Sequence, residues 1–212
     1  MNESRNRLLP IVLIWSLLMA ALFAVPHLFT LGDPGDFLIR NTIRVSLLFW
    51  FGAMFWRIHQ PERRRERLLW SLAWLAFIVH VVMAFEHYHR WSHRSAIDHV
   101  QSVSGYGPGL FVSYTFTLLW TLDVLQWWLA PSSRKRRPVW LNRLWYGFMI
   151  FVIVNGAIVY ETGIVRYFTV AAFLLLVVFW DYNSRWIRKT GDSRLNECHE
   201  DSATDENRMN TG

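Results

Sequence analysis

Six long apolar stretches, separated by short blocks of charged residues, run through most of this 212-residue chain. The first of them, residues 8–31, contains no Asp, Glu, Lys or Arg. A helix needs about 20 apolar residues to cross the hydrocarbon core of a bilayer, and most of the stretches approach that length. We therefore predict an all-α fold, a polytopic helical membrane bundle whose roughly six transmembrane helices cover residues 8–31, 37–56, 68–88, 110–130, 139–160 and 167–183.

The two ends of the chain need separate interpretation. A retained first helix is favoured over a cleaved signal peptide, because Leu22 occupies a position before the possible cut after Ala24 where a small residue is preferred. The polar residues 185–212 are expected to form a disordered cytoplasmic tail, so the transmembrane domain is expected to cover residues 1–184.

Basic residues lie beside the apolar stretches. The net charge of +6 could suit a nucleic acid, but this placement is typical of the Lys and Arg blocks that hold loops in the cytoplasm. With a cytoplasmic N-terminus, five of the 22 Lys and Arg residues fall on the opposite side: Arg40, Arg44, Arg90, Arg94 and Arg166. We expect both termini in the cytoplasm, and a lipid bilayer rather than a nucleic acid as the partner.

One segment concentrates the residues that can bind metal ions or transfer protons. Four of the eight histidines and two carboxylates lie close together in it: Glu86, His87, His89, His93, Asp98 and His99. Under the predicted topology, this segment is the extracytoplasmic end of the third span and the loop that follows.

Helical periodicity would bring three of these side chains together. If the helix continues beyond the membrane surface, Glu86, His89 and His93 lie within an arc of about 60°, because each residue turns by about 100°. One carboxylate and two imidazoles suit a divalent transition metal such as zinc or iron, with a position left for water or substrate. We expect a metal site there, with His87 or Glu161 moving protons.

Other interpretations of the segment remain open. Its side chains could form a hydrogen-bonded cap at the level of the lipid headgroups, or respond to pH. A b-type haem is an alternative cofactor, with His80 or His87 as one axial ligand and a partner required from another span, where His27 is the candidate. Asp33 and Asp36 follow the first span and could add ligands to a metal.

Polar residues inside the expected spans should have partners. Asp123 lies in the fourth expected span, where an ionised carboxylate is costly unless it is paired, and Arg143 on the next span is the expected partner. Asn155 and His80 are expected to form hydrogen bonds between helices.

One block, AFEHYHRWSH at Ala84–His93, resembles a block in uncharacterised bacterial multi-pass membrane proteins. The resemblance covers the third span and the loop after it, and it implies about six spans in a bacterial inner membrane without implying an activity. Membrane di-iron hydroxylases and desaturases carry several histidine-rich boxes, whereas this chain has one, which argues against assigning it to them.

Three functions are consistent with these patterns. The chain could be a metal-dependent enzyme acting on a lipid or another small molecule outside the cytoplasm, through a metal-bound water. It could be a haem protein that passes electrons across the membrane, or a structural or regulatory subunit with no chemistry and no cofactor of its own. No motif in the sequence selects between hydrolysis and oxidation.

Overall fold

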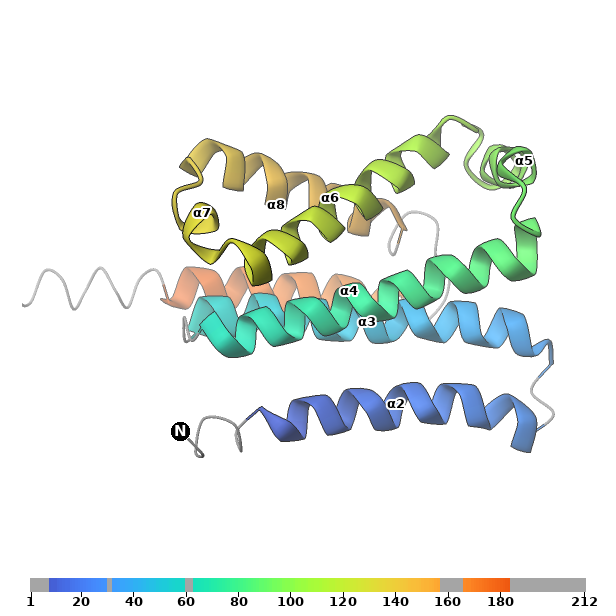
Figure 1. Ribbon diagram of the computed structural model, residues 1–212, viewed down its shortest axis with the longest axis horizontal. Coiled ribbons are helices and arrows are strands. Elements are labelled where there is room, and N and C mark those ends of the chain that lie inside the picture. The colour runs from blue at the N-terminus through green and yellow to red at the C-terminus, as the bar shows by residue number, and fades with distance from the viewer. Residues whose placement is uncertain (1–7, 30–31, 60–62, 157–165, 184–212) are drawn as a thin grey trace, which may run out of the picture. The chain divides into compact units, whose positions relative to one another are not determined.

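The computed structural model describes residues 8–29, 32–59, 63–156 and 166–183. The regular structure in these ranges is entirely helical, which confirms the predicted all-α class for them (Figure 1). The named elements are α2 (Leu9–Leu28), α3 (Pro34–His59), α4 (Arg63–Ala84), the π-helix η1 (Phe85–His89), α5 (His93–Ser104), α6 (Gly109–Leu129), α7 (Pro131–Lys135) and α8 (Val139–Val154).

The chain divides into two units, residues 1–170 and 171–212. In the second unit, residues 171–183 continue a helix that begins at residue 166. The expected tail, residues 185–212, and the expected proton carrier Glu161 lie outside the described residues.

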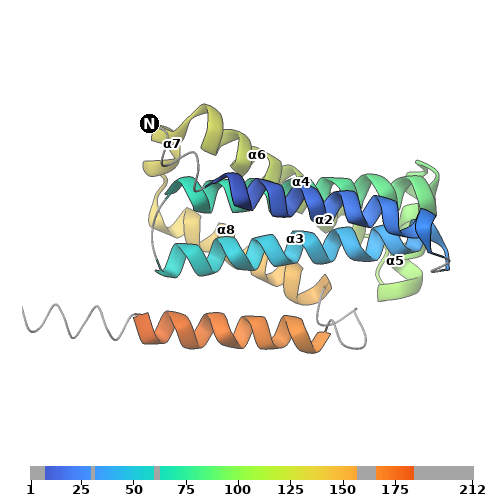
Figure 2. The same cartoon turned by 90° about the horizontal axis from the view of Figure 1, so that it is seen from below.

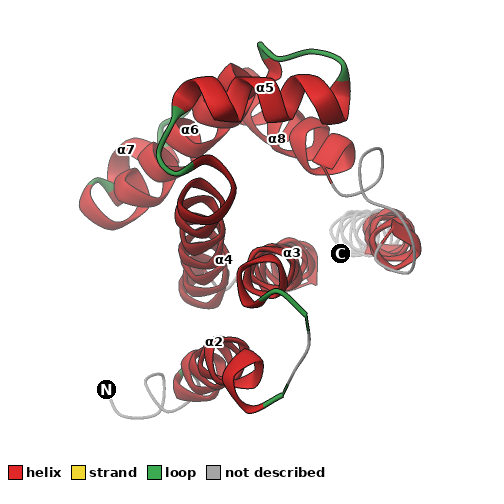
Figure 3. Ribbon diagram, turned by 90° about the vertical axis from the view of Figure 1, so that its right-hand side faces the viewer, coloured by secondary structure: helices red, strands yellow, loops and turns green. Residues whose placement is uncertain are grey.

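Helices of the first unit run side by side. α2, α3 and α4 pack against one another, α6 packs on α4, and α8 packs on α6 (Figures 1 and 2). α5 contacts η1 and α6, and it runs across the direction of α4 (Figure 3). The unit therefore has two distinct ends. We call the end formed by the start of α3, η1 and α5 the histidine end, and the end formed by the start of α4, the end of α6 and α7 the arginine end.

Within the part of the chain that the structure describes, two helices are long and apolar enough to cross a membrane, Leu9–Leu28 and the continuous helical segment Arg64–His89. α5 and α6, which meet at a bend of 111°, would supply a third span if they are counted as one. Val139–Val154 is apolar but shorter. These lengths support a membrane protein, and large apolar side chains such as Leu17 and Leu118 face outward as lipid contact requires.

Small side chains bring α3 and α4 into close contact. Ala53 on α3 and Ala73 and Ala76 on α4 are fully buried. Ser46 Oγ donates a hydrogen bond of 2.9 Å to the backbone oxygen of Ala73, which joins the two helices in their apolar interior. Helices in lipid associate through this kind of packing and through hydrogen bonds, because burial from lipid gives little hydrophobic gain.

α4 does not continue as a regular α-helix through the histidine-rich segment. It changes to the π-helix Phe85–His89, and Arg90 and Trp91 then adopt left-handed φ values of 45° and 60°. α5 starts after Ser92, whose side chain accepts a hydrogen bond from the Ser95 backbone N–H. The chain thus changes direction between residues 89 and 93.

Overpacking the α3–α4 contact tests this arrangement. Ala73→Leu should lower the free energy of unfolding by about 1–3 kcal/mol, because three added heavy atoms have no space beside α3. Unfolding in mixed micelles with increasing denaturing detergent measures this change. The same substitution at Ala21, which is exposed on α2, should leave stability nearly unchanged. Equal effects at the two positions would contradict the close α3–α4 contact.

Candidate functional site

A cavity of about 310 Å³ lies between α3, α4, α6 and α8. The space exists because small residues face it, Ser46 from α3, Ser113 from α6 and Gly156 just after α8. A Cβ atom built on Gly156 would meet no atom within 4 Å. The rest of the wall is largely apolar and aromatic, made by Ile43, Leu47, Trp50, Phe77, Phe116, Trp120, Val152 and Ile153.

The cavity is charged at one end and aromatic at the other. Arg40, Arg44, Leu47 and Trp50 line it along one face of α3. An α-helix rises about 1.5 Å per residue, so the two ends of this face, Arg40 and Trp50, are separated by about 15 Å along the axis. The arginines lie toward the histidine end of the unit, and the tryptophan lies deeper in the helical bundle.

Polar side chains near the charged end have defined contacts. Arg40 Nε lies 2.8 Å from Asp36 Oδ2, and Arg44 Nη1 donates a hydrogen bond of 3.1 Å to Asn41 Oδ1. His80 Nδ1 is 2.9 Å from the backbone oxygen of Ile39, which confirms the predicted role of His80 in joining two helices.

The aromatic end is tightly packed. Trp120 stacks on Phe77, with ring centroids 5.4 Å apart, and contacts Phe116 edge to face. Its Nε1 is buried and has no hydrogen-bond partner among the described residues. This end of the cavity, lined by Trp50 and Trp120, therefore presents a largely apolar surface.

Side chains at the histidine end link η1 to the start of α3. His87 Nε2 lies 3.1 Å from Asp33 Oδ1, and the Tyr88 hydroxyl donates a hydrogen bond to Asp36 Oδ1. Gly35 permits this approach, because a Cβ there would lie only 2.3 Å from His87 Nδ1. The hydrogen bond from Tyr88 is the main cause that lowers the pKa of Asp36, which precedes the expected span; Arg40 acts in the same direction and burial opposes it.

The three side chains predicted to share a metal ion have different partners. Glu86 accepts a hydrogen bond from Trp91 Nε1, His93 Nδ1 lies 2.7 Å from the Tyr114 hydroxyl, and His89 is buried. Among the described residues there is no group of three or more His, Cys, Asp and Glu placed to hold a metal ion. The assumption of a continuous α-helix was wrong, because the π-helix and the left-handed turn change the direction of each side chain after residue 84.

Nor do the haem candidates form a pair. His80 lines the cavity beside α3, whereas His87 contacts Asp33 beyond the start of that helix. His27 lies in the last turn of α2 and does not line the cavity. Asn155, expected to join helices, instead donates a hydrogen bond of 2.8 Å to the Phe151 backbone oxygen of its own helix.

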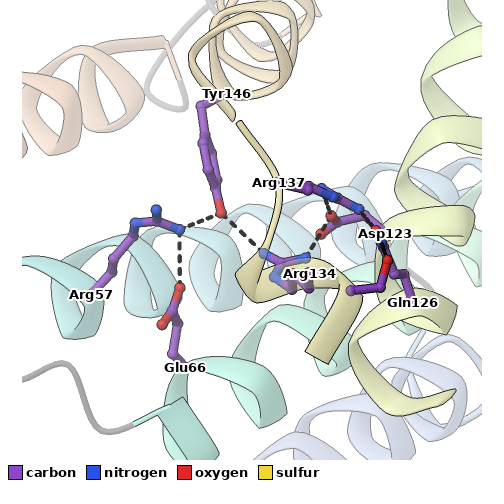
Figure 4. Close-up of polar contacts among 8 residues, drawn as sticks. Arg57, Glu66, Asp123, Gln126, Arg134, Arg137 and Tyr146 are labelled. Atoms are coloured by element: carbon purple, nitrogen blue, oxygen red, sulfur yellow. Dashed lines mark hydrogen bonds and ion pairs between the residues drawn. The ribbon is translucent and has the colours of Figure 1, made fainter. Parts of the chain in front are cut away.

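Asp123 is fully buried at the arginine end and is neutralised by two arginines (Figure 4). Arg134 Nη1 and Arg137 Nη1 lie 2.5 and 2.7 Å from Asp123 Oδ1. The prediction that Arg143 pairs with Asp123 was wrong. The short helix α7 and the turn after it return residues 134–137 to the side of α6, whereas Arg143 is exposed on α8.

This ionic network extends across the arginine end (Figure 4). The Tyr146 hydroxyl contacts Arg57 and accepts a hydrogen bond of 3.1 Å from Arg134, while Arg57 pairs with Glu66 at 3.2 Å. Behind it, Trp70 contacts both Tyr146 and Trp120, with centroids 6.0 and 5.5 Å apart. Aromatic rings therefore separate the ionic network from the cavity.

Sequence patterns did not predict the cavity or the two arginines that neutralise Asp123. Arg134 and Arg137 were interpreted only as a cytoplasmic basic block, although their closeness in sequence to Asp123 was a usable signal.

No protein-family model, curated protein or solved structure matches this chain. A functional assignment must therefore come from the geometry of its own residues.

Charge removal at the arginine end distinguishes the observed partners from the expected one. Asp123→Asn should lower the free energy of unfolding by about 3–5 kcal/mol, because two largely buried arginines lose their fully buried counter-ion. Arg137→Gln should be destabilising in the same direction, and Arg143→Gln should change stability by less than about 0.5 kcal/mol. Unfolding in mixed micelles measures all three, and a larger loss for Arg143→Gln than for Arg137→Gln would contradict the pairing.

Proposed function

We propose that this chain is a six-span membrane protein, with both termini in the cytoplasm, that binds an anionic single-chain amphiphile in the cavity between α3, α4, α6 and α8. The observation that supports this function is the separation of charge and apolar surface within one cavity, with Arg40 and Arg44 at one end and Trp50 and Trp120 at the other. The proposed ligand carries a phosphate or carboxylate group on one hydrocarbon chain.

Depth and direction agree with a lipid-like ligand. The cavity face of α3 extends over about 15 Å, roughly half of the 30 Å hydrocarbon core. A ligand in one leaflet has its headgroup at the membrane surface and its chain directed toward the bilayer centre. Arg40 and Arg44 would meet the headgroup, and the aromatic end would meet the chain.

The positive-inside pattern supports the choice of leaflet. The basic blocks Arg63–Arg67 and Arg134–Arg137 belong to the arginine end, which we assign to the cytoplasm. Arg40 and Arg44 lie toward the other end, so the cavity would draw its ligand from the outer leaflet. In a bacterial cell this membrane would be the inner membrane.

Guanidinium groups suit the proposed headgroup. Arg forms paired, charge-assisted hydrogen bonds with phosphate and carboxylate oxygens, and each such bond contributes more than a neutral one. Asp36 pairs with Arg40, and Asn41 accepts a hydrogen bond from Arg44. Two guanidinium groups at one end of the cavity favour an anionic headgroup over a neutral one.

The metal-enzyme and haem hypotheses have less support as primary functions. Glu86, His89 and His93 do not form one group, and His80 and His87 have separate partners. A structural subunit without a ligand would not require a cavity with small residues facing it from three sides.

Filling the cavity should remove the ligand. Leu47→Trp places an indole in the cavity, and the amount of co-purified amphiphile should fall by at least about tenfold, the change expected for a loss of about 1.4 kcal/mol in affinity. Native mass spectrometry of the protein released from membranes measures the bound mass. Leu118→Trp, on an outward face of α6, is the matched control and should keep the ligand. Equal occupancy in both variants would contradict the proposal.

Headgroup charge can be tested separately. Arg40→Gln together with Arg44→Gln should weaken binding of a lysophospholipid with a phosphate monoester by about tenfold or more, because charge-assisted hydrogen bonds are lost. Titration with a fatty acid in the same detergent shows whether the site prefers a phosphate or a carboxylate headgroup. Titration with a neutral monoacylglycerol shows how much of the affinity comes from the hydrocarbon chain alone. Preference for the neutral lipid by the unaltered protein would overturn the anionic assignment.

A further inference from the structure

His89 is a buried imidazole at the start of the change in chain direction. It is the last residue of the π-helix η1, and only 8% of its surface is exposed. Its Nδ1 atom is buried and has no hydrogen-bond partner among the described residues. Buried polar atoms nearly always have partners, so a nitrogen of this kind calls for a physical explanation.

A second imidazole lies beside it. His99 is exposed on α5, and its ring centroid lies 5.3 Å from that of His89, with the ring planes at 69°. Two imidazoles that bind one tetrahedral ion through Zn–N bonds of about 2.0–2.1 Å place their ring centroids about 5 Å apart. The observed spacing fits this arrangement.

A neighbouring side chain limits the position of His99. Tyr88 stacks on the His99 ring, with centroids 5.5 Å apart and planes at 13°. The Tyr88 hydroxyl is itself held by Asp36 on α3. Contacts around a metal ligand commonly orient it in this way before the ion arrives.

The π-helix and the turn after it are what bring these rings together. A π-helix is often found at functional sites, and left-handed φ values in Arg90 and Trp91 are costly for residues other than glycine. This turn lets α5 contact η1, and it places a residue ten positions later beside His89. Glu86 and His93 have other partners, so the pair of His89 and His99 differs from the set of three ligands expected from helical periodicity.

We propose that His89 and His99 form a two-histidine site for a divalent transition-metal ion of the zinc class, with water or an added ligand in the remaining positions. Neutral imidazole suits zinc, cobalt, nickel and copper, whereas calcium and magnesium prefer oxygen ligands. His99 gives the ion access from water, and His89 supplies a ligand from the interior. The site is separate from the cavity and does not depend on the proposed amphiphile.

Cobalt is a direct probe, because tetrahedral Co²⁺ absorbs visible light far more strongly than the hydrated ion. The full chain in mild detergent should bind one Co²⁺ with this absorption, and added Zn²⁺ should displace it. His99→Ala should weaken binding at least about tenfold, and the exposed position keeps the fold intact. His93→Ala, whose ring contacts Tyr114 instead, is the matched control and should bind as the unaltered protein does.

Far-UV circular dichroism and gel filtration of each variant confirm that it is folded. Loss of the Co²⁺ signal in His99→Ala with retention in His93→Ala supports the two-histidine site. The inference is overturned if the unaltered protein gives no tetrahedral signal, if His99→Ala binds Co²⁺ as tightly as the unaltered chain, or if His93→Ala loses binding equally. None of these results depends on whether a lipid occupies the cavity.

Discussion

Hydrocarbon offers no hydrogen-bonding partner, and this constraint underlies the arrangement of the first unit. Helices satisfy their own backbone groups, so what remains is to pack them and to accommodate the polar side chains they carry. Ala53, Ala73 and Ala76 let α3 and α4 approach closely. Where Ser46, Ser113 and Gly156 line the space between the helices, small residues leave a cavity instead of a contact.

Polar side chains lie at both ends of this bundle, and their contacts differ between the two ends. At the arginine end, Asp123 is fully buried but has two arginines on one of its oxygens, and the network is closed by Tyr146, Arg57 and Glu66. At the histidine end, the buried Nδ1 atom of His89 has no hydrogen-bond partner among the described residues. The first end is consistent with a structural role, while the second holds the proposed metal site.

Apolar length and charge placement were enough to predict the helical class and the approximate starts of α2, α6 and α8. The partners of individual side chains were harder to predict, because they depend on local departures from a regular helix. A π-helix at Phe85–His89 changes the facing of every residue after it, and periodicity cannot detect that change. Likewise, the short helix α7 and the turn after it bring Arg137, and not Arg143, into contact with Asp123. The cavity depends on four helices at once, and no single stretch of sequence contains it.

Accessibility of single cysteines tests most directly whether the chain crosses the bilayer as proposed. With Cys198 replaced by Ser, one cysteine is introduced at Ser102 before α6 or at Ser132 after it. A membrane-impermeant maleimide added to intact cells should modify the Ser102→Cys protein, and should modify the Ser132→Cys protein only after the membrane is opened. Modification of both proteins from the same side would show that α6 does not cross the bilayer. The assignment of the cavity to the outer leaflet would then be contradicted.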